Sequence, residues 1–177
     1  MAFFKNKQVG GQVYDLSHLE PFDFILNTDN RSITVHVEFG CHCFTEKLSE
    51  HHTPDLRYTH NGETRAFNAE RHRLSFKLPD LIQTVGNKTV YHTKKGSYFI
   101  LRDESIEAKK VPYLIFFTAF KSTNKTVHVR LIVRSAYLKP EMAERAAPVR
   151  FSTLMQFVRD GRTPPQGPTI YMKRTQK

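Results

Sequence analysis

Tryptophan is absent from the sequence, and cysteine occurs only twice among 177 residues. Cys41 and Cys43 stand one residue apart, and a disulfide between such close neighbours would be strained and would close almost no loop. The sequence therefore excludes a disulfide-stapled secreted fold and indicates a reducing compartment. A chain of this length can form one domain with a substantial core, so it needs neither a disulfide nor a metal to fold.

Long hydrophobic runs are also missing. No stretch reaches the roughly 20 apolar residues of a membrane helix, and the most apolar segment, 111–120, is interrupted by Pro112. The first eight residues lack the apolar run that a signal peptide requires. We therefore expect a cytoplasmic protein without a membrane partner.

The common signatures of nucleotide and hydrolase enzymes are absent as well. The sequence has no Gly-Lys-Ser/Thr phosphate loop, no GxGxxG dinucleotide motif and no GxSxG nucleophile elbow. Its carboxylates do not cluster in the way that a Mg²⁺-dependent nuclease requires. We therefore expect no cofactor.

Acidic residues are few compared with basic ones, 17 against 27, which gives a formal charge of +10. The excess is largest between residues 145 and 177, where seven basic residues face one acidic residue. Such a segment suits a polyanionic partner, or else merely keeps the chain soluble. We predict a nucleic acid, RNA rather than DNA. The cations expected to bind it are Lys94, Lys95, Arg150, Arg159, Arg162, Lys173 and Arg174.

The hydrophobic pattern predicts an α+β fold made mainly of antiparallel sheet, with two or three short helices. Polar and apolar residues alternate over Arg31–Cys43, as in a strand with one buried face. Asn68 is a suitable helix cap, and a second short helix should begin near Pro79. Four further strands, at 89–93, 97–102, 113–121 and 126–137, predict a meander with a polar excursion at 103–110.

The C-terminal part of the sequence is predicted to form a basic extension. We expect a single α+β domain over 1–144, and a basic helix with an extended tail over 145–177 that packs on this domain or trails from it. Apolar spacing from Phe151 to Val158 indicates the helix, and Gly161 should end it.

Cysteine and histidine gather in one segment of the chain. If a metal binds there, Cys41 and Cys43 with His51 or His52 are the expected ligands, because zinc takes both residue types. Strand alternation, however, places both cysteines on the apolar face, where free cysteine behaves as a small hydrophobe. We therefore expect core cysteines beside a hydrated histidine loop.

One face of the predicted strand at 126–137 carries His128, Arg130 and Arg134, and Tyr137 follows at its end. Metal-free RNA cleavage needs a base for the 2′-hydroxyl, an acid for the leaving 5′-oxygen and cations for the phosphorane charge. His92 could act as the base and either Tyr137 or His128 as the acid. Arg130, Arg134 or Lys94 would stabilise charge. A passive phosphate-binding strip without catalysis fits the same residues.

A helix followed by a four-stranded antiparallel meander, with His, Arg and Tyr on one face, resembles the metal-free ribonucleases of the barnase, EndoU, colicin and RelE type. The resemblance covers about 68–137. It implies a cleft on the concave sheet face, with His92, Arg130, Arg134 and Tyr137 in the family roles. It also implies a bacterial toxin or defence effector, for which an inhibitory protein would be a natural partner.

Two other functions remain open at this point. The first is a non-catalytic basic module that binds nucleic acid or nucleoprotein through its C-terminal segment. The second is a small metal- or ligand-binding domain built around Cys41 to His60.

Overall fold

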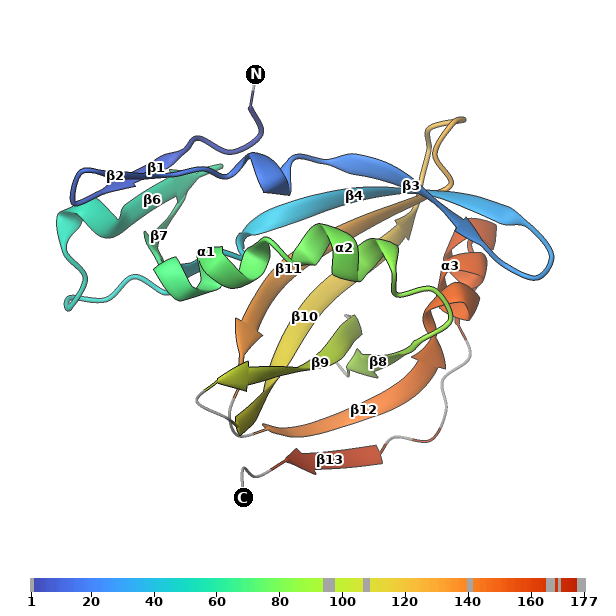
Figure 1. Ribbon diagram of the computed structural model, residues 1–177. Helices are drawn as coiled ribbons and strands as arrows, with labels where there is room; N and C mark the ends of the chain where they lie inside the picture. The colour runs from blue at the N-terminus through green and yellow to red at the C-terminus, as the bar shows by residue number, and fades with distance from the viewer. Residues whose placement is uncertain are drawn as a thin grey trace.

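The computed structural model describes residues 2–93, 98–106, 109–139, 142–164, 168 and 170–174. Over these residues the chain has the predicted α+β fold, dominated by antiparallel sheet, with three short α-helices. A strongly twisted eight-stranded sheet forms the body of the molecule, and helices α1 (Ala69–Ser75) and α2 (Leu78–Gln83) lie against one face of it (Figure 1). No helix within the described ranges is long and apolar enough to cross a membrane.

The large sheet has the strand order β13-β12-β8-β9-β10-β11-β4-β3. Its strands are β3 (Phe22–Asn27), β4 (Ser32–His42), β8 (Thr89–Thr93), β9 (Tyr98–Ile106), β10 (Lys109–Lys121), β11 (Val129–Leu138), β12 (Met142–Arg150) and β13 (Ile170–Arg174). Neighbouring strands are antiparallel except β11 and β4, which are parallel. This parallel pair joins the predicted meander to the N-terminal hairpin.

Two smaller sheets flank the body. One consists of β1 (Lys7–Val9) and β2 (Gln12–Tyr14), and the other of β5 (Thr45–Glu46), β7 (Glu63–Phe67) and β6 (Arg57–His60). Short 3₁₀ turns occur at η1 (Ser17–Leu19) and η2 (Pro54–Leu56). Asn61 and Gly62 join β6 to β7 with positive φ angles of 49° and 81°, as the Asn-Gly pair predicts for a tight hairpin.

Strand β4 follows the alternation that the sequence predicts. Every second residue from Ile33 to Cys41 is buried, while the residues between them are at least partly exposed. The buried face continues on β11 with Val129, Leu131 and Val133, all fully buried. Together these side chains form the part of the hydrophobic core that the large sheet contributes.

The helices cover this core and begin where the sequence indicates. The Asn68 side chain caps α1 by accepting a hydrogen bond of 2.9 Å from the Arg71 backbone N–H. Pro79 lies in the first turn of α2, where its missing N–H needs no partner. Leu78 and Ile82 of α2 are fully buried in the same core cluster as β4 and β11.

The polar excursion predicted at 103–110 is wrong, because the strands extend into it. Strand β9 continues to Ile106, and β10 begins at Lys109. Backbone pairing with β10 runs along the whole of β9 from Tyr98. Ladder hydrogen bonds depend on the backbone and tolerate charged side chains, so polarity alone did not mark the end of the strand.

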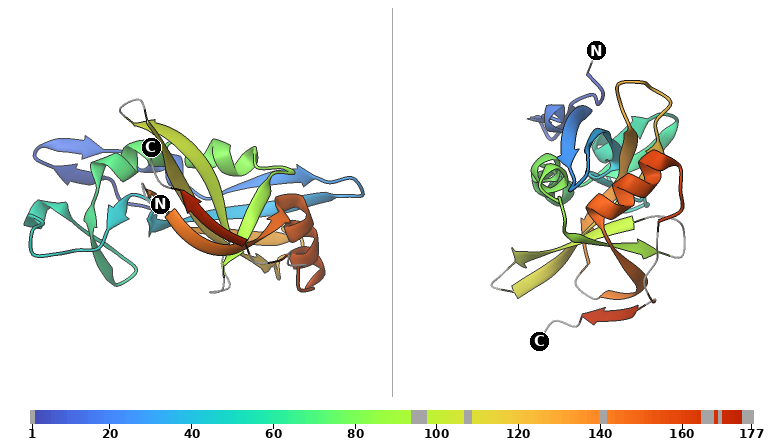
Figure 2. Two further views of the ribbon diagram at one scale, coloured as in Figure 1. Left: turned by 90° about the horizontal axis from the view of Figure 1, so that it is seen from below. Right: turned by 90° about the vertical axis from the view of Figure 1, so that its right-hand side faces the viewer.

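The C-terminal extension predicted at 145–177 is also corrected. Residues 145–150 belong to β12, which pairs with β8 on one side and β13 on the other. Helix α3 (Phe151–Asp160) packs across β10, β11 and β4 (Figure 2). It ends at Gly161, whose φ of 71° is left-handed as predicted. Arg145 and Arg150 made this segment look like a solvated tail, although Ala147 between them is buried.

His18 of η1 is held in a neutral state by its surroundings. Ser75 donates its hydroxyl proton to the His72 carbonyl, so the 2.7 Å contact from His18 Nε2 must be an N–H donated to Ser75 Oγ. Nδ1 is buried without a hydrogen-bond partner. Burial, and next the His72 ring 5.5 Å away, lower the pKa of His18 to about 4, against a smaller opposing effect of Asp15.

The stability of the fold should therefore fall as the pH drops from 6.5 to about 4. In this range the unfolded chain binds a proton at His18 and the folded chain does not. The free energy of unfolding therefore decreases as the pH falls. We expect a loss of about 2 kcal/mol, allowing for partial exposure of the ring. Urea unfolding at pH 7 and pH 4.5 measures it. The His18→Gln variant should lack this share of the pH dependence, and an unchanged dependence would contradict the assignment.

Candidate active site

The outward face of the large sheet carries the polar side chains of three neighbouring strands. Arg130 and Arg134 of β11 are exposed on this face, opposite the buried valines, as the sequence predicts. The parallel register of β4 and β11 pairs Arg130 with His36. The antiparallel register of β3 and β4 pairs His36 with Asp23. A row of charged groups therefore crosses the sheet.

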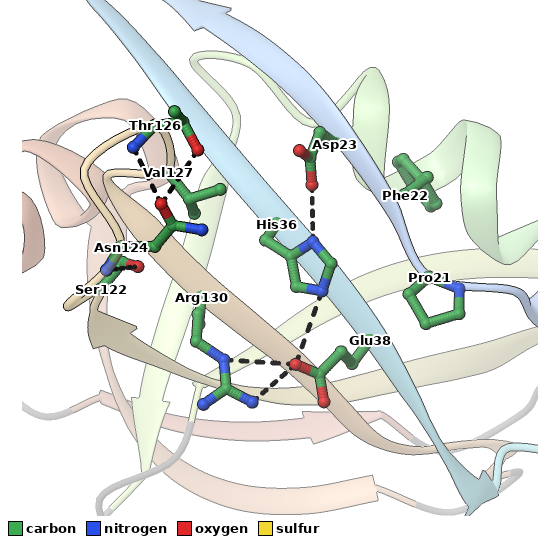
Figure 3. A pocket seen from close by; sticks show the side chains of 10 residues that line it. All are labelled: Pro21, Phe22, Asp23, His36, Glu38, Ser122, Asn124, Thr126, Val127 and Arg130. Atoms are coloured by element: carbon green, nitrogen blue, oxygen red, sulfur yellow. Dashed lines mark hydrogen bonds and ion pairs between the residues drawn. The ribbon is translucent and has the colours of Figure 1, made fainter. Parts of the chain in front are cut away.

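These groups form a continuous chain of contacts (Figure 3). His36 Nδ1 lies 2.5 Å from Asp23 Oδ1, and its Nε2 lies 3.6 Å from Glu38 Oε1. The same Glu38 oxygen accepts hydrogen bonds from Arg130 Nη2 at 2.6 Å and Nε at 3.2 Å. Asp23 thus fixes the imidazole, and Arg130 fixes the second carboxylate.

An open pocket surrounds this chain of contacts. Its wall is the connection between β10 and β11, together with the start of β3 (Figure 3). The residues that complete the lining are Pro21, Phe22, Ser122, Asn124, Thr126 and Val127. The connection is held in shape by Asn124, whose Oδ1 accepts hydrogen bonds of 3.0 Å from the Thr126 N–H and hydroxyl. The pocket is accessible to solvent and has acid, base and cationic groups on one side.

His128 has a structural contact rather than the predicted place in the site. Its ring Nδ1 accepts a hydrogen bond of 2.8 Å from the Thr34 backbone N–H, and the His128 backbone N–H donates to the Thr34 carbonyl at 2.9 Å. These bonds join the pocket wall to β4. Nδ1 thus acts as an acceptor that holds the ring against β4.

His92 is separated from the predicted cations. Its ring lies 5.0 Å from Tyr98, which stacks on the fully buried Phe117. His92 therefore faces the core side of β8, whereas Arg130 and Arg134 face outward from β11. Two strands, β9 and β10, lie between β8 and β11. The structure does not bring His92 together with the arginines, and its predicted role as base is corrected.

Tyr137 and Arg134 lie further along β11. The Tyr137 ring stacks on Phe116 at 5.6 Å, and the Arg71 guanidinium lies 5.0 Å from the centre of the ring. Arg134 donates a hydrogen bond of 3.1 Å to Thr118 Oγ1 and is exposed. Tyr137 therefore packs beside α1, while Arg134 continues the cationic row of the outward face.

The predicted nucleic-acid contacts are scattered over the molecule. Lys94 and Lys95 lie outside the described residues, and Lys173 and Arg174 end strand β13. Arg150 is exposed at the start of α3. Arg159 and Arg162, at the other end of α3, converge on Asp160 at 3.3 and 3.1 Å, and Arg31 joins them at 3.3 Å.

The residues predicted for a metal do not come together. Cys43 is fully buried, and its thiol donates to the Val133 carbonyl at 3.7 Å. His52 contacts Ser49 and Glu46, and His51 is exposed in the same loop. Within the described ranges, the group with metal-ligand spacing is instead Cys41, His42 and Glu63. Cys41 is the one predicted ligand that it retains.

The site contains residues that the sequence did not single out as functional, namely Asp23, His36 and Glu38. The alternation of β4 did assign His36 and Glu38 to its polar face. The sequence could not indicate that β4 pairs with β11 and that His36 and Glu38 share a sheet face with Arg130, because the two strands are far apart in the chain.

Comparison with known proteins gives one family. The model of the YjaZ family matches residues 6–159, which include the whole of the pocket. No curated protein and no solved structure matches the chain.

Proposed function

For this chain, which belongs to the YjaZ family, we propose a nucleic-acid-directed activity, namely cleavage of RNA without a metal ion at the outward face of the large sheet. The observation that carries the proposal is the contact between Glu38 and His36 beside Arg130 in an open pocket. A carboxylate, an imidazole and a guanidinium supply a base, an acid and a counter-charge.

The roles follow from the contacts. Glu38 accepts the proton of the ribose 2′-hydroxyl, and the 2′-oxygen attacks phosphorus. The bond from phosphorus to the 5′-oxygen breaks, and protonated His36 gives its Nε2 proton to that oxygen. The products are a 2′,3′-cyclic phosphate and a 5′-hydroxyl. The proton on Glu38 then returns to His36 across the 3.6 Å between them, which resets the pair.

The neighbouring groups support these roles. Asp23 contacts Nδ1 of His36 and so directs Nε2 toward Glu38 and the pocket. Arg130 can stabilise the charge of the phosphorane. Arg134, two strand steps further along the same face, lies about 13 Å from Arg130 and could contact a phosphate further along the RNA. The need for a 2′-hydroxyl favours RNA over DNA.

A ribonuclease of this kind would act in the cytoplasm, where RNA is available. The resemblance to metal-free ribonucleases extends the proposal to a bacterial toxin or defence effector. An inhibitory protein would then cover the pocket, and acidic side chains would suit its contact with Arg130 and Arg134.

The test is incubation of the purified protein with labelled RNA in EDTA. We expect cleavage to fragments that end in 2′,3′-cyclic phosphates, and no cleavage of a DNA strand of the same sequence. A substrate with 2′-O-methyl groups should bind and resist cleavage, because its 2′-oxygen has no proton to lose. Cleavage that requires added divalent ions, or equal cleavage of DNA, would contradict the proposal.

A second candidate function is RNA binding without cleavage. It is favoured by the three arginines that converge on Asp160 and by the adjoining shallow pocket that Lys121 and Arg159 line. One carboxylate cannot neutralise so many cations, so phosphates could bind here. A salt-dependent shift of RNA without cleavage, lost in an Arg159→Gln/Arg162→Gln variant, would favour this candidate.

A further inference from the structure

The end of strand β4 meets the β6–β7 hairpin at a group of three side chains. Cys41 and His42 are the last residues of β4, and Glu63 is the first residue of β7. One ligand atom of each lies within 4.8 Å of the others. His42 Nε2 is 2.9 Å from Glu63 Oε2 and 3.0 Å from Oε1. The group lies at the C-terminal end of β4, whereas the pocket proposed to bind RNA takes His36 and Glu38 from the middle of the strand.

We propose that Cys41, His42 and Glu63 bind a zinc ion, with water as the fourth ligand. Thiolate sulfur, imidazole nitrogen and carboxylate oxygen are the protein ligands of zinc. Bond lengths of about 2.0–2.3 Å imply that ligand atoms lie about 3.5 Å apart in a tetrahedral site. The group therefore has to contract by about 1 Å, which side-chain rotation at the partly exposed His42 and Glu63 allows.

The surroundings hold the ligands in position. Arg65 donates to Glu63 Oε1 at 3.1 Å and to Thr45 Oγ1 at 2.9 Å. The Thr45 hydroxyl in turn donates to the Cys41 carbonyl at 2.6 Å. Such outer contacts orient the ligands of a metal. One thiolate and one carboxylate balance the charge of Zn²⁺, and Arg65 adds a positive charge outside the ligand shell.

Cys43 is excluded from this site although it stands two residues from Cys41. It is fully buried and its thiol points to the Val133 carbonyl of β11. The chain thus contains two cysteines of which only one faces the zinc ligands. This arrangement provides a matched control for the proposal.

The zinc ion would connect two parts of the fold. Cys41 and His42 belong to the large sheet, while Glu63 belongs to the small sheet of β5, β6 and β7. A ligand bound only by the folded state raises stability in proportion to the logarithm of its concentration. We therefore assign the site a structural role, in which zinc fixes the hairpin to the end of β4.

The experiment uses the full chain after removal of metals with EDTA. Titration with Zn²⁺ alone, against a chromophoric chelator, should give one ion per chain. The melting temperature should rise by about 5–10 °C at a hundredfold excess of zinc over its dissociation constant. Titration with Co²⁺ should produce the absorption band of a thiolate bound to cobalt.

Variants identify the ligands. Cys41→Ser should abolish the thiolate band and weaken zinc binding by at least about tenfold, whereas Cys43→Ser should retain both. Glu63→Gln changes a half-exposed residue, so the fold should survive and the rise in melting temperature should be lost. Absence of the thiolate band in the wild-type protein, or its loss in Cys43→Ser rather than Cys41→Ser, would overturn the proposal.

Discussion

Replacement of Glu38 by glutamine is expected to lower the rate of RNA cleavage by about 10²–10⁴-fold. Glutamine has the same shape and keeps an oxygen that can accept the hydrogen bonds of Arg130, so the pocket should remain intact. It cannot take up the proton of the 2′-hydroxyl. The measurement is kcat/KM on a short labelled RNA in EDTA.

The control is Glu50→Gln, which makes the same chemical change at an exposed residue outside the pocket. This variant should cleave at the wild-type rate and melt at the wild-type temperature. Glu38→Gln should match it in melting temperature and differ only in cleavage. Equal activity of the two variants would remove Glu38 from the mechanism.

His36 gives an independent check of the same pair. His36→Ala should lose about as much activity as Glu38→Gln, and the double variant little more, because an acid and a base that act in one step are not additive. Asp23→Asn should retain part of the activity and shift the pH profile, since Asp23 only positions the ring. Losses that simply multiply would indicate two unrelated effects.

The sequence predicted individual strands better than their arrangement. Alternation located β4 and β11 and assigned Arg130 and Arg134 to an exposed face, because successive side chains of any strand point to opposite sides of the sheet. The neighbour of β11 could not be predicted in the same way. Thr34 and His128 pair across 94 positions of the chain, and nothing local in either strand specifies the other.

The error at His92 has a related cause. Strand β8 is five residues long, with Val90 and Tyr91 both available to face a core. In so short a strand, alternation does not decide which face is buried. The structure buries Val90, and His92 lies on the same side next to Tyr98. The imidazole that lies beside Arg130 in the structure is that of His36 on β4.

Gly40 of β4 lies directly against the backbone of β11, and a side chain at this position should destabilise the fold. A Cβ atom there would lie 2.9 Å from the Arg134 carbonyl oxygen and 3.3 Å from that of Val133. Both are backbone atoms of β11, next to the register shift between Val133 and Ser135, so they cannot move without breaking the parallel pairing.

We expect Gly40→Ala to cost about 2 kcal/mol and Gly40→Val about 3 kcal/mol or more, which would lower the melting temperature by about 5–10 °C. Cleavage should fall as well, because displacement of β11 separates Arg130 from Glu38. Gly10→Ala is the control, since no atom lies within 4 Å of its added Cβ and only the φ of +53° opposes it, at about 1 kcal/mol. Thermal unfolding of both variants measures the difference. If Gly40→Ala melted no lower than Gly10→Ala, the contact between Gly40 and the β11 backbone would not limit stability, and β11 could move to accommodate the added methyl group.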